Sequence, residues 1–214
     1  KAKRDPYLRR ARDCAELTIP YLMPPEGHNE HSVMPEPYQG LGARAVVSLS
    51  ARLMVAMYPP GKPSFKLDIP PEQRIAQGEM AIGTDIVQGL VLSEQLIQAE
   101  IERKQWRRAT NLAHQYLLVT GNALEMMQPD NSIRVFRLDQ YCVSRDIPGA
   151  VKEIITEEYL SPEALPESAR KLVAADDFSQ NSVPLYTHCK MNKTGVFVCY
   201  QEINGKKVAG SEGK

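Results

Sequence analysis

The stretch GNALEMMQPDNSIRVFRLDQYCVSRD, residues 121–146, marks the point at which the chain changes from helical to strand periodicity. Before it, Leu112, Tyr116 and Val119 recur at helical spacing, and Gly121 suits a helix end because glycine readily adopts left-handed backbone. After it, short apolar runs alternate with polar residues and with turn signals, a pattern typical of antiparallel strands. The stretch therefore separates a helical amino-terminal part from a strand-rich carboxyl-terminal part.

The amino-terminal part is expected to consist mainly of helices. Asp5 and Pro6 suit the start of a helix over residues 5–18. A second helix is predicted over residues 38–58, with an apolar stripe formed by Val46, Leu49, Leu53 and Met57. Further helical pieces are predicted within residues 71–121, with a break near the basic residues 103–108. The proline-rich segment 24–37 is expected to be a loop or an extended arm, and the alternation over residues 65–69 predicts a short strand.

The carboxyl-terminal part reads as strands joined by turns, with one helix between them. Strands are predicted over residues 123–127, 133–138, 141–145, 151–157, 183–190 and 196–203. Ser161 and Pro162 favour the start of a helix that continues to about residue 174. Asn204–Gly205 is a strong hairpin signal. The predicted fold class is α+β, with a mainly helical part over residues 1–122 and a strand-rich α+β part over residues 123–214.

Composition describes an ordinary globular chain. The 214 residues carry 26 Lys plus Arg against 26 Asp plus Glu, so the formal net charge is zero, which argues against a DNA-coating protein. No apolar run approaches the roughly 20 residues that a membrane span needs. The charges are nevertheless segregated, because basic residues gather in the first twelve positions and over 103–108, whereas acidic residues dominate 153–177. Opposed patches of this kind suit contacts between copies of one chain or with a polyanion.

The sequence holds no recognisable catalytic site. Phosphate-binding loops, nucleophile elbows and zinc-protease motifs are all missing, and no cysteine pair or histidine spacing matches a metal site. We therefore expect a protein that is not an enzyme and needs no cofactor. Cys189 and Cys199 fall on facing strands of a predicted hairpin, but reduced thiols are the default expectation for all four cysteines.

Two groups of residues are candidates for binding a partner or a neighbouring subunit. The first is a basic segment around the only tryptophan: Arg103, Lys104, Trp106, Arg107 and Arg108. On a helix these cations could contact phosphates while Trp106 stacks on a base; alternatively, they are a solvated helix end with Trp106 covering the core. The second is a polar line on one helix, formed by Arg44, Ser48 and Arg52, which could face the acidic half of a neighbour.

Several stretches of the chain, taken in order, resemble the head-to-tail connector (portal) proteins of short-tailed phages. The residues that carry this resemblance are 7–24, 42–59 with 65–67, 121–124, 136–146, 164–171 and 183–188. Portal proteins have no catalytic signature, so the specific signal is the order of these stretches along nearly the whole chain.

The resemblance implies an assembly protein. Portal subunits form a ring at one capsid vertex, here expected to be a dodecamer, around the channel through which double-stranded DNA is packaged and ejected. The implied partners are other copies of the chain, capsid protein, the tail adaptor, the terminase and internal core proteins. The implied location is the virion, after assembly in the host cytoplasm, with no membrane involved.

Within such a subunit, this chain would form part of the wing domain, the outer body of the ring. The stem and clip are expected beyond residue 214, so DNA contact by this part of the chain is not expected. The alternative is a stand-alone nucleic-acid-binding domain that uses residues 103–108.

Overall fold

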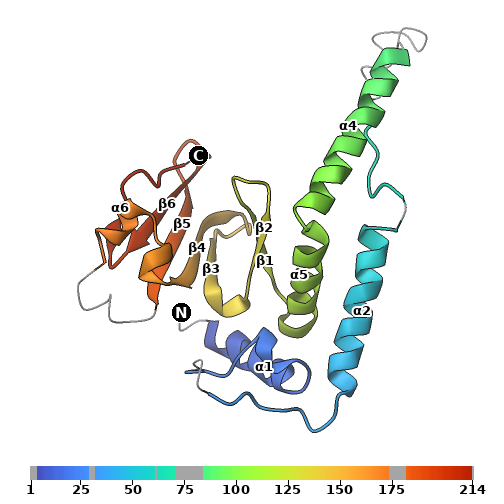
Figure 1. Cartoon of the computed structure of the whole chain (residues 1–214). Helices are drawn as coiled ribbons and strands as arrows, with labels where there is room; N and C mark the ends of the chain where they lie inside the picture. Colours follow the sequence, from blue (N-terminus) through green and yellow to red (C-terminus); the bar gives the residue numbers. More distant parts are fainter. Residues whose placement is uncertain (1–3, 29–31, 61, 71–83, 174–181, 214) are drawn as a thin grey trace. The chain divides into compact units, whose positions relative to one another are not determined.

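The computed structural model describes residues 4–28, 32–60, 62–70, 84–173 and 182–213 (Figure 1). The chain divides into two compact units, which we name by their content. The helical unit is Arg10–Val135, and the sheet unit is Lys1–Arg9 together with Phe136–Lys214. Helix gives way to strand at Gly121, as the sequence indicates, but the first hairpin belongs to the helical unit, so the unit boundary falls after Val135.

The helical unit contains four helices of α type, one short 3₁₀ turn and a two-stranded hairpin among its described residues. They are α1 (Asp5–Glu16, which begins in the sheet unit), η2 (Pro20–Leu22), α2 (Leu41–Met57), α4 (Thr84–Arg103), α5 (Trp106–Thr120), β1 (Leu124–Met127) and β2 (Ile133–Phe136). These bounds confirm the predicted helices, apart from residues 71–83, which lie outside the described part of the chain. α2 packs on α5, and α5 also contacts η2.

The predicted strand over residues 65–69 is wrong. These residues form no regular strand, and the backbone N–H of Leu67 donates to the Glu94 carboxylate on α4 at 2.6 Å rather than to a neighbouring strand. Alternating hydrophobicity reports that one side of a segment is covered, but it does not supply a strand partner.

The predicted apolar stripe of α2 is wrong at two positions. Leu49 and Met57 are 45% and 49% exposed, whereas Ser50 is 1% exposed and lies on the packed side. Nearly every residue of this helix is apolar or small, so periodicity alone does not decide which face is covered. The close approach of the α2 backbone to Leu17 helps to decide which face is covered. A Cβ added at Gly42 would lie 2.6 Å from the carbonyl oxygen of Leu17, so this side of the helix has room only for glycine.

A sharp junction separates α4 from α5, as the sequence predicts. Gln105 adopts left-handed backbone with φ 54°, which ends the helical path after Arg103 and restarts it at Trp106. At the other end of α5, Gly121 has φ 74° and its N–H donates to the carbonyl of Leu117 at 3.0 Å. Both features fix the direction of α5 by local backbone geometry.

The sheet unit is built on five consecutive antiparallel strands. They are β3 (Tyr141–Arg145), β4 (Val151–Leu160), β5 (Val183–Met191), β6 (Phe197–Ile203) and β7 (Lys206–Lys207), in that order across the sheet. The predicted hairpin at Asn204–Gly205 is confirmed, and both residues have positive φ, 50° and 73°. Arg4 ties the start of the chain to this unit by donating to the carbonyls of Leu138 and Tyr141.

The helix predicted over residues 161–174 is largely wrong. A 3₁₀ turn, η4 (Pro162–Ala164), is followed by the single-turn helix α6 (Glu167–Arg170). Leu165 is extended, with ψ 143°, because the residue before a proline is pushed out of the helical region by Pro166. The proline therefore splits the expected helix, and residues from 174 to 181 lie outside the described part.

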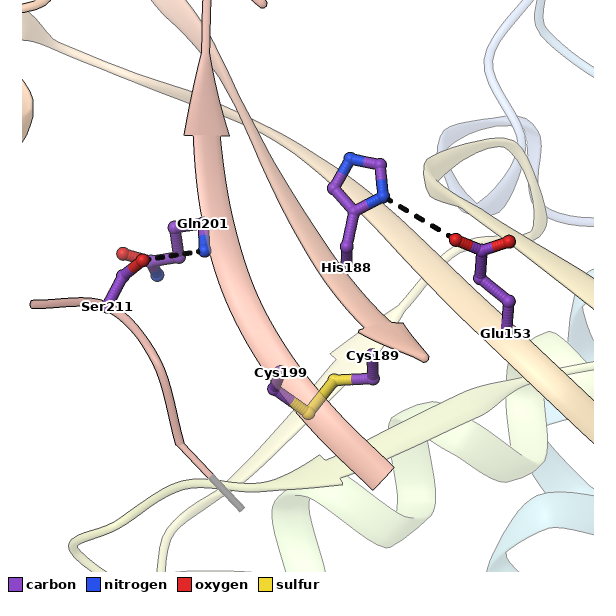
Figure 2. The surroundings of a disulfide bond; sticks show 6 residues. All are labelled: Glu153, His188, Cys189, Cys199, Gln201 and Ser211. Carbon is purple, nitrogen blue, oxygen red and sulfur yellow. Dashed lines mark hydrogen bonds and ion pairs between the residues drawn. A yellow bond between two sulfur atoms is a disulfide. The ribbon is translucent and has the colours of Figure 1, made fainter. Parts of the chain in front are cut away.

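The two faces of this sheet differ in chemistry. On one face lies an apolar core, formed by Leu165, Ala169, Val173, Val183, Leu185, Ile203 and Val208, and Thr156 and Glu158 are also buried on this face. On the other face, Glu157 pairs in register with Tyr186, which pairs with Glu202. The His188 ring lies 3.9 Å from the Glu153 carboxylate (Figure 2). Its other nitrogen lies 3.6 Å from the Glu202 carboxylate.

A disulfide joins β5 to β6 (Figure 2). Cys189 and Cys199 are directly opposite each other, with Cα atoms 4.0 Å apart. The N–H and carbonyl of Cys199 both bond to Gly213 on its other side, at 2.9 Å each, so the two cysteines form a pair without mutual backbone hydrogen bonds. Facing side chains are closest at such pairs, which explains the bond. The expectation of reduced thiols is therefore wrong for this pair, while Cys14 and Cys142 are free.

Candidate functional site

The basic segment 103–108 lies at the α4–α5 junction, and most of its polar groups are engaged within the helical unit. Arg103 forms two hydrogen bonds of 2.7 Å with Glu100, one turn earlier on α4. The Arg103 hydrogen bonds lower the pKa of Glu100. The Arg103 side chain stays 67% exposed, so this pair neutralises the charge without burying it.

Lys104 reaches the turn between β1 and β2. Its ammonium lies 3.1 Å from the Asp130 carboxylate, and its side chain is 18% exposed. Hydrogen bonds from the hydroxyl and the backbone N–H of Ser132, together with the Lys104 ammonium, hold the pKa of Asp130 well below its usual range. The carboxylate is therefore charged at neutral pH and fixes the turn to the helical junction.

Trp106, the first residue of α5, also binds this turn. Its indole N–H donates to the carbonyl of Asn131 at 2.7 Å, and Asn131 has positive φ, 63°. The ring lines an apolar pocket of about 320 Å³ between α2, α5 and the hairpin; the other lining residues are Met57, Tyr58, Thr110, Glu125, Met127 and Ile133. A tryptophan with its N–H bonded to the backbone acts as a packed anchor and is not a free platform for a base.

Arg107 joins the start of α5 to the end of α2. Its guanidinium donates to Glu102 at 2.7 Å and to the carbonyl of Tyr58 at 2.8 Å. It also stacks over the Tyr58 ring, 5.3 Å from the ring centroid. A cation at the carboxyl end of a helix complements the partial negative charge of the helix dipole, so Arg107 stabilises this corner.

Three arginines proposed from the sequence remain available to a partner. The side chain of Arg108 is exposed and has no hydrogen-bond or ion-pair partner among the described residues. Arg44 and Arg52 are exposed on the outer face of α2, and their side chains likewise have no partner in the described part of the chain. The structure thus brings Lys104, Trp106 and Arg107 together as an internal clamp and leaves Arg44, Arg52 and Arg108 on the surface.

A second surface feature, which sequence reasoning missed, is the apolar exterior of α4. Six large aliphatic side chains are between 42% and 72% exposed on this helix: Ile86, Val87, Val91, Leu92, Leu96 and Ile97. The signal was present in the sequence, because residues 86–99 contain one charged residue, Glu94, which bonds to the Leu67 backbone. A helix that is apolar on most of its circumference is normally covered by other protein.

The described residues offer little for other kinds of chemistry. No group of three or more His, Cys, Asp or Glu side chains within them is placed to hold a metal ion. Among the same residues, no helix combines the length and apolar character needed to cross a membrane. What the described residues do provide is an α4–α5 junction held by side-chain contacts, three exposed arginines without side-chain partners at Arg44, Arg52 and Arg108, and the exposed apolar side chains of α4. Such surfaces suit association with another protein.

Comparison with known proteins agrees with this description. Residues 1–213 match the family described as "Bacteriophage head to tail connecting protein". The portal protein of Escherichia phage T7 is 31% identical over 225 residues, covering 100% of this chain and 41% of the relative. The portal protein of Enterobacteria phage T3 is 32% identical, covering 96% of this chain and 40% of the relative, and that of Enterobacteria phage SP6 is 27% identical.

The chain spans about two fifths of the length of these relatives. The family match, in contrast, covers nearly every residue of the chain. On that ground, the chain belongs to the family of bacteriophage head to tail connecting proteins.

Proposed function

We propose that this chain is part of a portal subunit, which assembles with copies of itself into a ring at one capsid vertex. The observation that carries the proposal is the match of residues 1–213 to the connector family, together with the portal proteins among its relatives. The exposed apolar helix α4 and the unpaired arginines of α2 support it, because a ring subunit must present faces that complement a different face of the next copy.

In this proposal the ring is a dodecamer that surrounds the path of double-stranded DNA during packaging and ejection. The chain itself would contribute to the outer body of the ring, and the parts that line the channel and meet the terminase would lie beyond residue 214. Capsid protein, tail adaptor, terminase and internal core proteins are the expected partners. The subunit would have no catalytic role, and it would reside in the virion after assembly in the host cytoplasm.

The experiment is a mass measurement on the full-length protein, by analytical ultracentrifugation or native mass spectrometry. We expect one closed species with the mass of about twelve subunits. A protein that stays monomeric at concentrations of tens of micromolar would contradict the proposal.

The alternative, a nucleic-acid-binding domain centred on residues 103–108, is disfavoured by the contacts of that segment. Arg103, Lys104 and Arg107 already have carboxylate partners, and the Trp106 N–H is bonded to backbone. Of these five residues, only Arg108 has a side chain without a partner in the described part of the chain. We therefore expect weak DNA binding, with a dependence of log affinity on log salt concentration that Arg108→Ala leaves unchanged. If Arg108 contacted a phosphate, the substitution would reduce the magnitude of this slope by about one.

A further inference from the structure

The outer faces of α2 and α4 carry matching seams that the described part of this chain leaves uncovered. On α2 the seam is Leu41, Ala45, Ser48, Arg52 and Val55; on α4 it is Asp85, Gly89, Leu92, Leu96 and Ala99. Every one of these residues is exposed, with Leu41 and Val55 at 60% and 58%, and Leu92 and Leu96 at 60% and 72%. Both seams advance by alternating steps of four and three residues, which is the spacing of helices that pack along their length.

The opposite face of α4 is already occupied by its own unit, so the seam points away from it. Glu94 bonds to the backbone of Leu67, and Gln98 donates to the Ser64 hydroxyl at 3.2 Å. Ile101, on the same side as these two residues, is 7% exposed. Residues two positions from Glu94 and from Gln98, such as Leu92 and Leu96, lie on the other side of the helix.

The directions of the two helices fix how copies can meet. Within one chain α2 and α4 run in opposite directions (Figure 1), and the bond from Arg107 to the carbonyl of Tyr58 places the end of α2 at the start of α5. Neighbouring copies in a closed ring differ by a small rotation, so each is nearly parallel to the next. The α2 helix of one copy is therefore also close to antiparallel to the α4 helix of its neighbour.

In that antiparallel register, large residues face small ones at successive layers. Leu41 faces Ala99, Ala45 faces Leu96, and Ser48 faces Leu92. One layer further, Arg52 faces Gly89 and lies within a turn of Asp85, a carboxylate with no partner among the described residues. A parallel register would instead place Leu41 against Asp85, Ala45 against Gly89 and Arg52 against Leu96, which leaves both charges unpaired and the small residues facing each other.

We infer that α4 of each subunit docks along α2 of the neighbouring copy, antiparallel, with Ala45 opposite Leu96 and Arg52 paired with Asp85. The inference rests on the proposed function, because it uses the near-parallel orientation of copies in a ring. It commits to a second copy as the occupant of the α4 face, since charge and side-chain size on α2 complement those on α4.

Disulfide cross-linking in the full-length protein tests this register. The background replaces the free thiols of this chain by Cys14→Ser and Cys142→Ser. The test variant adds Ala45→Cys and Leu96→Cys, which face each other in the antiparallel register but not in the parallel one. After the ring mass has been measured, mild oxidation should give a ladder of covalent multimers on a non-reducing gel. The matched control pairs Ala45→Cys with Lys193→Cys, an exposed position in the turn after β5, and should give no ladder.

The outcomes separate the docking inference from the proposed function. Rings that give no ladder, or an equal ladder in the control, would overturn the docking and leave the portal function standing. Failure to form rings before oxidation would count against the proposed function itself. Protection of the Leu96→Cys thiol from maleimide in monomeric full-length protein would show that another segment of the same chain covers α4, which also overturns the docking.

A charge exchange provides a second, independent test. Arg52→Asp alone and Asp85→Arg alone should each raise the concentration needed for half-maximal ring formation by at least tenfold, because like charges then meet in every interface of the ring. The double variant should return to within about threefold of the unmodified protein. Lys193→Asp is the control and should change nothing. Equal loss in the double and single variants would exclude the Arg52–Asp85 pair.

Discussion

The sheet unit and the helical unit treat their apolar side chains in opposite ways. The sheet unit encloses a core in which Ala169 and Ile203 are fully buried and Val183 is 1% exposed. The helical unit leaves large aliphatic side chains of α2 and α4 in contact with water, up to 72% exposed at Leu96. Burial of apolar area is the main driving force for folding and for association alike. The core residues of the sheet unit are already buried by folding, whereas the exposed aliphatic side chains of α2 and α4 can still be buried by association with another surface.

The largest expected effect comes from truncating a buried side chain of the sheet unit, compared with truncating an exposed side chain of the helical unit. Ile203→Ala should lower the stability of the sheet unit by about 2 to 5 kcal/mol, because it leaves a cavity in a closed core. Leu96→Ala should change folding stability by no more than about 0.5 kcal/mol, because its side chain is mostly in water, yet it should weaken ring formation. Hydrogen-exchange mass spectrometry in increasing denaturant reads the two units separately. Equal destabilisation by both variants would break the comparison.

The disulfide stabilises the fold of the sheet unit, and its removal should have the next largest effect on folding stability. The bond closes a loop with a sequence separation of 10, for which chain entropy predicts a contribution of about 2 to 3 kcal/mol. Cys189→Ser together with Cys199→Ser should lower the denaturant concentration at which β5 and β6 unfold, as measured by hydrogen exchange of their peptides. Cys14→Ser is the control. Peptide mapping after alkylation should recover the two cysteines linked. Free thiols at both positions in the purified full-length protein would contradict the bond.

The helical unit depends on polar contacts at its corner, which Trp106→Phe tests. The change keeps an aromatic ring in the pocket but removes the 2.7 Å bond to Asn131, so we expect a loss of about 1 kcal/mol. Arg108→Ala, which removes no contact in the described part, serves as the control and should stay within about 0.5 kcal/mol. A loss no larger than that of the control would mean that the turn is held by Asp130 alone.

The smallest effect concerns the polar face of the sheet. A hydrogen bond of 2.8 Å to the Glu157 carboxylate, together with partial burial, raises the pKa of Tyr186 to about 12. The unfolded value is about 10, so the neutral phenol stabilises the fold fully below pH 10, and this contribution is lost as the pH rises toward 12. Tyr186→Phe should flatten the decline of stability between pH 9 and 12. An unchanged decline would assign it to other groups, such as Tyr159, whose hydroxyl lies 3.2 Å from the same carboxylate.

Local signals in the sequence predicted the elements well where one residue type dictates the backbone. Asn204–Gly205 gave the correct hairpin, Gly121 the end of α5, and the change of period after it the first strands. The helix over residues 161–174 failed because the start signal at Ser161 was weighed above Pro166, which ends any helix within a turn. The prediction of the buried face of α2 failed because the helix itself carries small or apolar residues on nearly all sides, so periodicity does not single out one face.

The sequence by itself determined the order of elements, the α+β class, the position of the α4–α5 break and the family to which the chain belongs. The elements, the class and the break follow from periodicity and turn residues, which act over a few neighbouring positions, whereas the family follows from the order of matching stretches along nearly the whole chain. Only the tertiary structure decided which candidate residues are free. Lys104 meets Asp130, and Arg107 meets Tyr58, across 26 and 49 positions of the chain. Contacts over such separations depend on how the helices pack, so the sequence located the charges but not their partners.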